Sequence, residues 1–272
     1  MTGFLNIHHG EAPLIVSFPH TGTDIPPDLE ARLASPRQAR EDADWWVDRL
    51  YDFARDLGAT TIRTTISRSV IDVNRDPSGA SLYPGQATTA LCPTTTFDGA
   101  PLYRAGAEPD ADEIAARRTA YFEPYHDTLE TEIARLRADH AKVVLYDAHA
   151  IRSRIPRLFD GLLPHFNIGT NDGATCDPAL AEVVEEACAH SSFTHVMNGR
   201  FKGGWTTRHY GRPAQGVHAI QMELACRGYI DEPEAPDDAN WPTPYGEDRA
   251  APLRAVLRDV LRSCIAFAGS PA

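Results

Sequence analysis

The chain has 272 residues, which is the size of one large α/β domain or of two small domains. Its formal net charge of −12 opposes nonspecific binding to nucleic acid or to an anionic membrane. Five scattered cysteines without a CxxC pair argue against a disulfide framework or a thiolate zinc site. No signal peptide or run of about 18 apolar residues is visible, so we expect a cytoplasmic protein without a membrane span.

Strands alternating with helices are predicted along the chain. In chain order we expect a strand at 13–18, a helix at 44–57, a strand at 59–66, a long loop at 67–106, a helical region at 110–139 with a break near Pro124, a strand at 142–146, a polar loop to 177, a helix at 178–190, strands at 194–197 and 217–224, and a helix at 248–268. Asp42 and Asp44 lie near the start of the first helix, where side-chain oxygens commonly cap free amides. Without a repeat or a linker, this alternation predicts a single α/β domain over residues 1–272, with a mixed, mostly parallel sheet flanked by helices.

Two histidines follow predicted strands and are the best candidates for metal ligands. His20 follows the strand at 13–18, and His149 follows the strand at 142–146 together with Asp147. In open α/β sheets, ligands bind beyond the carboxyl ends of strands, and imidazole and carboxylate are typical ligands of hydrolytic zinc sites. Spacing leaves the third ligand open, and its candidates are Asp44, Asp147, Asp24 and Asp72. Asp147 could instead accept a ring N–H from a ligand histidine.

Glu223 and His209 are the candidates for proton transfer. Glu223 lies at the end of the apolar strand at 217–224, where an unpaired carboxylate is costly to bury. It is therefore either paired with an arginine or poised to relay a proton to the leaving amine of an amide, and we favour the second role. His209 is either a donor to the transition state or a histidine on a loop. No GxSxG elbow, P-loop or dinucleotide-binding motif offers another route.

An acidic protein that binds an anionic substrate needs a local basic pocket. Two arginine-rich segments, 152–157 and 200–212, could provide it, because the arginine fork binds carboxylates with two hydrogen bonds. Arg152 is a leading candidate because it closely follows His149, and Arg208 is the other. The remaining candidates are Arg68, Arg75, Arg154, Arg212 and Asn198, which opens the glycine-rich run NGRFKGG. These features predict a metal-assisted hydrolase that acts on a small acidic substrate.

The chain resembles the N-formylglutamate amidohydrolases, also called N-formylglutamate deformylases, over nearly its whole length. The motifs that carry the resemblance are PLIVSFPHTG, DADWWVDRLYDFARDLGA, SRSVIDVNRDPSG, LYPGQATTALCPTTTFDG, DAHAIRSRIPRLFDGLLPHFNIGTNDGATCDPAL, NGRFKGGWTTRHYGRP and VHAIQMELACRGY. The resemblance implies hydrolysis of N-formyl-L-glutamate to formate and L-glutamate, a step of histidine degradation, with one divalent metal ion, expected to be zinc. It also implies a fold similar to that of zinc carboxypeptidases and aspartoacylases, with His20 and His149 at metal positions and Glu223 as the general base.

One departure from the zinc carboxypeptidase pattern concerns the acidic ligand. Those enzymes carry histidine and glutamate as HxxE, whereas this chain reads His20-Thr21-Gly22-Thr23, so we expect Asp44 in DADWW to be the ligand. Two alternatives remain open. One is a related zinc amidase or carboxypeptidase that releases another N-acyl acidic amino acid or a terminal glutamate. The other is a non-catalytic dicarboxylate-binding protein, which needs no metal. The sequence leaves the preferred acyl group and the oligomeric state undecided.

Overall fold

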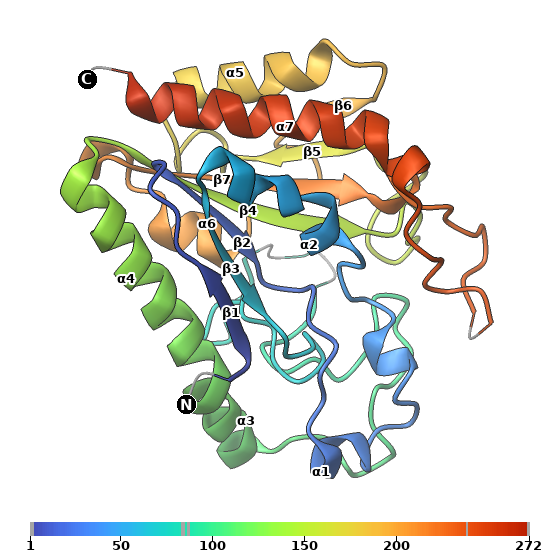
Figure 1. Cartoon of the computed structure of the whole chain (residues 1–272). Helices are drawn as coiled ribbons and strands as arrows, with labels where there is room; N and C mark the ends of the chain where they lie inside the picture. Colours follow the sequence, from blue (N-terminus) through green and yellow to red (C-terminus); the bar gives the residue numbers. More distant parts are fainter. Residues whose placement is uncertain (1–2, 83–84, 86–87, 238, 271–272) are drawn as a thin grey trace.

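Seven strands form one mixed sheet in the computed structural model, which describes residues 3–82, 85, 88–237 and 239–270 (Figure 1). The strands are β1 (Leu5–His8), β2 (Leu14–Phe18), β3 (Thr60–Thr64), β4 (Val143–Ile151), β5 (Phe166–Gly169), β6 (His195–Met197) and β7 (Val217–Ala225). Their order across the sheet is β1-β3-β2-β4-β7-β5-β6. Neighbouring strands are parallel except for β1 with β3 and β5 with β7. The prediction of a mixed, mostly parallel sheet is confirmed.

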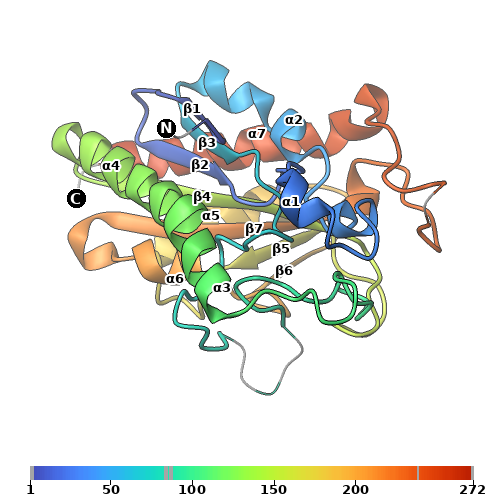
Figure 2. The same ribbon diagram turned by 90° about the horizontal axis from the view of Figure 1, so that it is seen from below.

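Helices cover both faces of this sheet. The α-helices are α1 (Pro27–Glu30), α2 (Val47–Leu50), α3 (Ala111–Arg117), α4 (Glu123–Asp139), α5 (Pro178–Ala189), α6 (Trp205–Tyr210) and α7 (Glu247–Gly269). Figures 1 and 2 show α5 and α7 on one face and α4 and α6 on the other, and the apolar core is divided in the same way. Within the described part of the chain, no helix is both long and apolar enough to cross a membrane.

The central strands bury apolar side chains on both faces, but near their carboxyl ends one face becomes polar. On β4, the even-numbered residues from Val144 to Ala150 pack in the core beneath α5 and α7. The odd-numbered residues face the opposite side, because side chains alternate along a strand. Val143 and Leu145 pack in the apolar core on that face, and Asp147 and His149 continue the row. The same strand therefore stabilises the core and presents polar groups.

The strand predicted at 142–146 is longer in the structure, and the helix predicted at 44–57 is broken. Because β4 extends to Ile151, His149 lies within a strand rather than after it. Trp46 has a φ of 66°, which is incompatible with a helix interior, so a short α2 and a 3-10 helix (Asp52–Leu57) replace one long helix. The expected capping by Asp42 and Asp44 is wrong, because no side chain caps α2.

Four of these strands and α-helices were not predicted: β1, β5, α1 and α6. The helical region at 110–139 is present, but it is interrupted by a π-helical turn at Arg118–Phe122, and Pro124 lies in the first turn of α4. That position suits proline, because amides in the first turn of a helix need no partner within the helix. α5 also begins with a proline, and the side chain of Asp177 caps it by accepting a hydrogen bond from the Ala179 amide.

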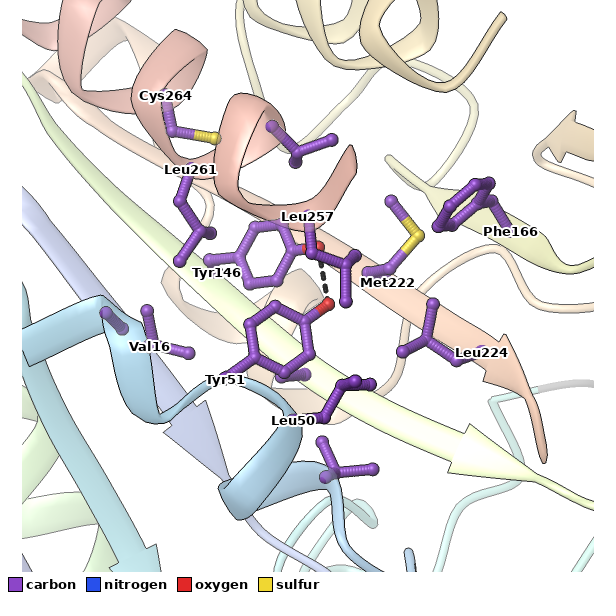
Figure 3. Close-up of a cluster of buried hydrophobic side chains, with 14 of the residues drawn as sticks. Val16, Leu50, Tyr51, Tyr146, Phe166, Met222, Leu224, Leu257, Leu261 and Cys264 are labelled. Atoms are coloured by element: carbon purple, nitrogen blue, oxygen red, sulfur yellow. Dashed lines mark hydrogen bonds between the residues drawn. The ribbon is translucent and has the colours of Figure 1, made fainter. Parts of the chain in front are cut away.

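Two buried tyrosines lie between β4 and α2 in the core beneath α7. Tyr51 follows α2 and Tyr146 lies on β4, and their hydroxyl oxygens are 2.9 Å apart in a hydrogen bond (Figure 3). Around them Figure 3 shows aliphatic side chains, including Leu50 and Leu257. Each hydroxyl therefore satisfies the other in surroundings that offer little else to bind.

We predict that Tyr51→Phe or Tyr146→Phe alone lowers the free energy of unfolding by about 1–3 kcal/mol, because each leaves one buried hydroxyl without its partner. The double variant should be nearly as stable as the wild type, since replacing both partners removes the unmet hydroxyl. Urea unfolding of the four proteins measures this coupling. Additive losses in the double variant would contradict it.

Candidate active site

Two histidines and an aspartate point their ligand atoms at one another near the carboxyl ends of β2 and β4. His20 Nδ1 and His149 Nδ1 are 3.1 Å apart, and Asp44 Oδ2 lies 3.1 Å from His149 Nδ1 and 3.7 Å from His20 Nδ1. All three side chains are buried. The backbone amide of Asp44 donates to the carbonyl of His20 at 3.0 Å, which fixes the Asp44 segment beside β2. This group could hold a metal ion.

A buried carboxylate lies within hydrogen-bonding distance of Nε2, the outer nitrogen, of each imidazole. Asp72 Oδ1 lies 2.7 Å from His20 Nε2, and Asp147 Oδ2 lies 2.8 Å from His149 Nε2. If each carboxylate accepts an N–H, each neutral ring directs the lone pair of Nδ1 inward. Two lone pairs at 3.1 Å repel each other unless a cation lies between them, so the donor set fits a divalent metal. Zinc accepts imidazole nitrogen and carboxylate oxygen in such sites.

The four aspartates considered as the third ligand therefore contact different atoms. Asp44 meets both inner nitrogens, whereas Asp72 and Asp147 bind the outer nitrogens and orient the rings. Asp24 is exposed, and its backbone forms a bridge with Ile66 away from the histidines. Of the four aspartates, Asp44 has the geometry of a ligand.

The buried carboxylates give the site a strong negative charge, which the neighbouring arginines partly offset. Without a bound ion the two imidazoles carry protons: burial raises the pKa of Asp44, but hydrogen bonds with the protonated His149 and His20 outweigh it and hold this pKa well below its usual value. Burial also raises the pKa of Asp72, and the charges of the protonated His20, Arg75 and Arg68 reverse the effect. Both carboxylates are therefore ionised at neutral pH, which favours a bound cation.

Asp72 connects His20 to two arginines. Its Oδ2 accepts from Arg68 at 2.8 Å and lies 3.4 Å from Arg75 Nε, while its Oδ1 accepts from the amide of Asn74 at 2.9 Å. Asn74 also donates from Nδ2 to Asp147 at 3.1 Å, so it links the carboxylates behind the two histidines. Sequence reasoning missed Asn74. Its signal was its place beside Asp72 in the motif DVNRD, within a stretch interpreted as a loop.

Glu223 lies on β7 beside His149, to which the strand register pairs it. Burial raises the pKa of Glu223 to about 7; the charge of Asp44 adds to this effect, and the charges of His149 and Arg68 oppose it. Such a carboxyl exchanges protons near neutral pH. Gln221 Nε2 donates to Glu223 Oε2 at 3.1 Å, while Gln221 Oε1 accepts from the Gly204 amide at 2.7 Å. Gln221, which sequence reasoning did not single out, thus holds Glu223 in place.

One cavity joins these groups and carries two of the predicted arginines. It is lined by His20, Arg68, Asn74, Arg75, Thr88, Thr89, Phe97, His149, Ile151, Leu158, Arg200, Phe201, Gly204, Gln221 and Glu223. Arg68 reaches it with its guanidinium 4.7 Å from the centre of the Phe97 ring. Arg200 was named only as a member of a basic segment, and the structure places it on the cavity wall.

Arg152, a leading candidate for substrate binding, does not line this cavity. Its Nη2 lies 2.5 Å from Asp98, 3.3 Å from Asp42 and 3.5 Å from Glu41. It follows the last residue of β4, so proximity to His149 in sequence does not bring it to the same side. Asp42 also accepts a hydrogen bond from the amide of Phe97 at 2.7 Å. Arg152 and its carboxylates therefore hold the loop that carries Phe97.

The other predicted arginines also lie outside the group that lines the cavity. Arg208, on α6, donates from Nε to the carbonyl of Gly203 at 2.9 Å. Arg154 and Arg212 are exposed. Arg68 and Arg75 are thus among the residues that line the cavity, and Arg208, Arg154 and Arg212 are not.

Asn198 and His209 are likewise absent from the cavity lining. Asn198 has a φ of 52°, and its side chain accepts the amide of Thr170 at 2.9 Å, which stabilises a turn after β6. His209 stacks on Trp205 with ring centres 4.0 Å apart. The geometry gives both residues packing or turn contacts rather than contacts with the histidine pair.

Comparison with known proteins agrees with this arrangement of motifs. A sequence model of the family described as N-formylglutamate amidohydrolase matches residues 12–230. The chain belongs to this family. It is 48% identical over 268 residues to the N-formylglutamate deformylase of Pseudomonas aeruginosa, covering 98% of each chain. It is 45% identical over 268 residues to that of Pseudomonas putida, covering 98% of this chain and 97% of the relative.

A solved member of the family has the same fold. The crystal structure of N-formylglutamate amidohydrolase from Ralstonia eutropha JMP134 superposes with a TM-score of 0.77 at 23% identity, over 97% of this chain and 96% of that chain. At this identity the likeness concerns the fold, and family membership rests on the sequence matches.

We predict that Asp44→Asn binds divalent metal more than about 100-fold more weakly than the wild type. Loss of a partner behind a ligand typically costs about 10–100-fold in affinity, and Asp44 faces the inner nitrogens directly. Competition with a chelator measures the affinity, and circular dichroism checks the fold. Asp24→Asn, at an exposed candidate position, is the matched control and should bind metal normally.

We predict that Arg152→Met destabilises the protein by about 1–3 kcal/mol at pH 8, because the partly buried carboxylates of Asp42 and Glu41 lose their counterion. The loss should be smaller at pH 5. Burial raises the pKa of Glu41 and of Asp42, so the folded protein holds more protons than the unfolded chain and loses stability as pH rises through these pKa values. Arg152 opposes the rise of both pKa values, so the loss of stability with rising pH is larger in the variant that lacks it.

Urea unfolding at the two pH values tests the Arg152 prediction. Arg154→Met removes an exposed arginine two positions further along the chain and should leave stability within about 0.5 kcal/mol of the wild type. An equal loss for Arg152→Met at both pH values would contradict the role of the carboxylates.

Proposed function

We propose that this protein hydrolyses N-formyl-L-glutamate to formate and L-glutamate in a metal-dependent reaction. The observation that carries the proposal is the convergence of His20, His149 and Asp44, with both histidines lining one cavity together with Glu223. Membership of the N-formylglutamate amidohydrolase family and the named Pseudomonas relatives support the substrate. Two imidazole nitrogens and a carboxylate oxygen that converge on one point favour an enzyme with a metal over a simple binding protein.

We assign the metal to His20, His149 and Asp44, with zinc as the proposed ion. A bound zinc ion would polarise the formyl carbonyl and make water nucleophilic near neutral pH. Asp72 and Asp147 fix the two imidazoles so that Nδ1 faces inward. Asn74 in turn holds Asp147, so the ring orientation is set before any ligand arrives.

Glu223 acts as the proton carrier in this proposal. It takes a proton from the water whose oxygen adds to the formyl carbon, and it delivers that proton to the amide nitrogen as the C–N bond breaks. A pKa of about 7 suits both steps, because the group must accept and release a proton at the same pH. Gln221 keeps the carboxylate directed at the cavity during this exchange.

Arg68 and Arg75 are the proposed partners of one substrate carboxylate. Both line the cavity and both contact Asp72, which holds their guanidinium groups beside His20. Arginine suits this role because its planar fork matches a carboxylate. The reactive amide then lies between these arginines and Glu223.

Several further features belong to the same proposal. The whole chain would be one catalytic domain with a zinc carboxypeptidase type of fold, acting in the cytoplasm in a step of histidine degradation. The five cysteines are free and buried, which supports a reducing compartment. The net charge of −12 supports a small-molecule substrate rather than nucleic acid.

The decisive experiment compares N-formyl-L-glutamate with N-acetyl-L-glutamate and N-acetyl-L-aspartate on one preparation whose metal content is measured. Hydrolysis should be fastest with the formyl substrate and should disappear with the metal on chelation. Preference for an acetyl substrate would point to a related amidase. Activity that persists after complete metal removal would contradict the metal-dependent mechanism.

We predict that Glu223→Gln lowers kcat by about 10²- to 10⁴-fold, because the amide keeps the shape of the side chain but carries no exchangeable proton of suitable pKa. Metal content should stay at the wild-type level. Glu182→Gln makes the same change on the exposed face of α5 and should leave kcat unchanged. A fully active Glu223→Gln variant would assign proton transfer to another group.

A further inference from the structure

Arg200 reaches the catalytic cavity from a different loop than Arg68 and Arg75. It lies between β6 and α6, and its Nε donates to the carbonyl of Leu158 at 2.8 Å. Its guanidinium carbon is 5.3 Å from the centre of the Phe201 ring. These contacts orient the side chain along the cavity wall formed by Leu158 and Phe201.

The two arginines beside the metal site already bind carboxylates of the protein. Arg68 contacts Asp72 at 2.8 Å and Asp44 at 3.4 Å, and Arg75 contacts Asp72 at 3.4 Å. Part of their charge is therefore used to hold the carboxylates around His20. A substrate with two carboxylates needs another cationic group in the cavity.

An apolar surface lines the side of the cavity on which Arg200 lies. Phe97 and Ile151 belong to one buried cluster, and Leu158 and Phe201 pack against it. All four line the cavity. Methylene groups bury favourably against such a surface, whereas a carboxylate there needs a charged partner. An apolar wall that carries the Arg200 guanidinium matches an aliphatic chain that ends in a carboxylate.

We propose that Arg200 binds the side-chain carboxylate of the N-acyl amino acid and thereby selects an acidic side chain. This inference rests on the proposed hydrolysis of N-formylglutamate. The α-carboxylate stays with Arg68 and Arg75 near Asp72, and the two side-chain methylenes lie along Phe97, Leu158 and Phe201. N-formyl-L-glutamine has nearly the same shape without the charge, so Arg200 distinguishes the two substrates by electrostatics.

The test compares Arg200→Gln with the wild type on N-formyl-L-glutamate and N-formyl-L-glutamine. Loss of a hydrogen-bonded charge pair should lower kcat/KM for the glutamate substrate on the order of 10- to 100-fold. The value for the glutamine substrate should change less than about twofold, because its amide does not use the charge. Arg200→Lys should recover part of the loss, since it restores charge without the planar fork. Metal content should be unchanged in both variants.

Arg262→Gln is the matched control, because Arg262 is an exposed arginine on α7. It should leave both substrates unaffected. Equal losses on both substrates in Arg200→Gln would overturn the inference and assign Arg200 to shaping the loop. Unchanged activity on the glutamate substrate would overturn it as well, by placing the carboxylate elsewhere.

A separate measurement distinguishes failure of this inference from failure of the proposed function. Calorimetric titration with L-glutamate reports binding without turnover, and Arg200→Gln should weaken it by a similar factor. A wild-type protein that hydrolyses neither formyl substrate would overturn the proposed function. In that case equal L-glutamate affinity in the wild type and in Arg200→Gln would also overturn the inference, whereas weaker binding by the variant would uphold it.

Discussion

The site depends on the contact between each imidazole and the carboxylate behind it. Asp72 and Asp147 accept from the outer nitrogens of His20 and His149, and this turns both inner nitrogens toward Asp44. The alternation of side chains along β4 provides the contact between Asp147 and His149 directly, because residues two apart on a strand share a face. Everything that the cavity can do with a cation follows from this orientation.

The buried carboxylates are tolerable because cations and hydrogen-bond donors surround them. Arg68 bridges Asp44 and Asp72, while Asp147 receives hydrogen bonds from Asn74 and from Ser17 on β2. Burying an ionised carboxylate without such partners would be very costly. Arginine would therefore have two uses in this fold: Arg68 neutralises carboxylates of the protein, and Arg200, on the cavity wall, is proposed to recognise an acidic ligand.

Residue type and motif made His20, His149, Asp44 and Glu223 candidates, because few side chains can hold a metal or carry a proton, and the structure brings these side chains together. The direction in which each side chain points was harder to predict. Because the predicted strand ended at residue 146, the alternation of side chains that continues to Ile151 was missed. With this alternation, Arg152 lies on the other face of the sheet from His149. β1 and β5 have four residues each, too few to show a period, although they complete the sheet. Hydrogen bonds of Asn74 depend on distant partners that spacing does not reveal.

The order of the ligands along the chain also bears on how the protein folds. His20 and His149 are 129 positions apart, and Asp44 is 105 positions from His149. An unfolded chain cannot hold these donors together without closing very long loops, which costs entropy and slows folding. Local segments therefore offer little chelation, and a metal ion would be captured only once β2 and β4 have paired. Metal uptake in this protein would mark the completion of long-range assembly during synthesis rather than its beginning.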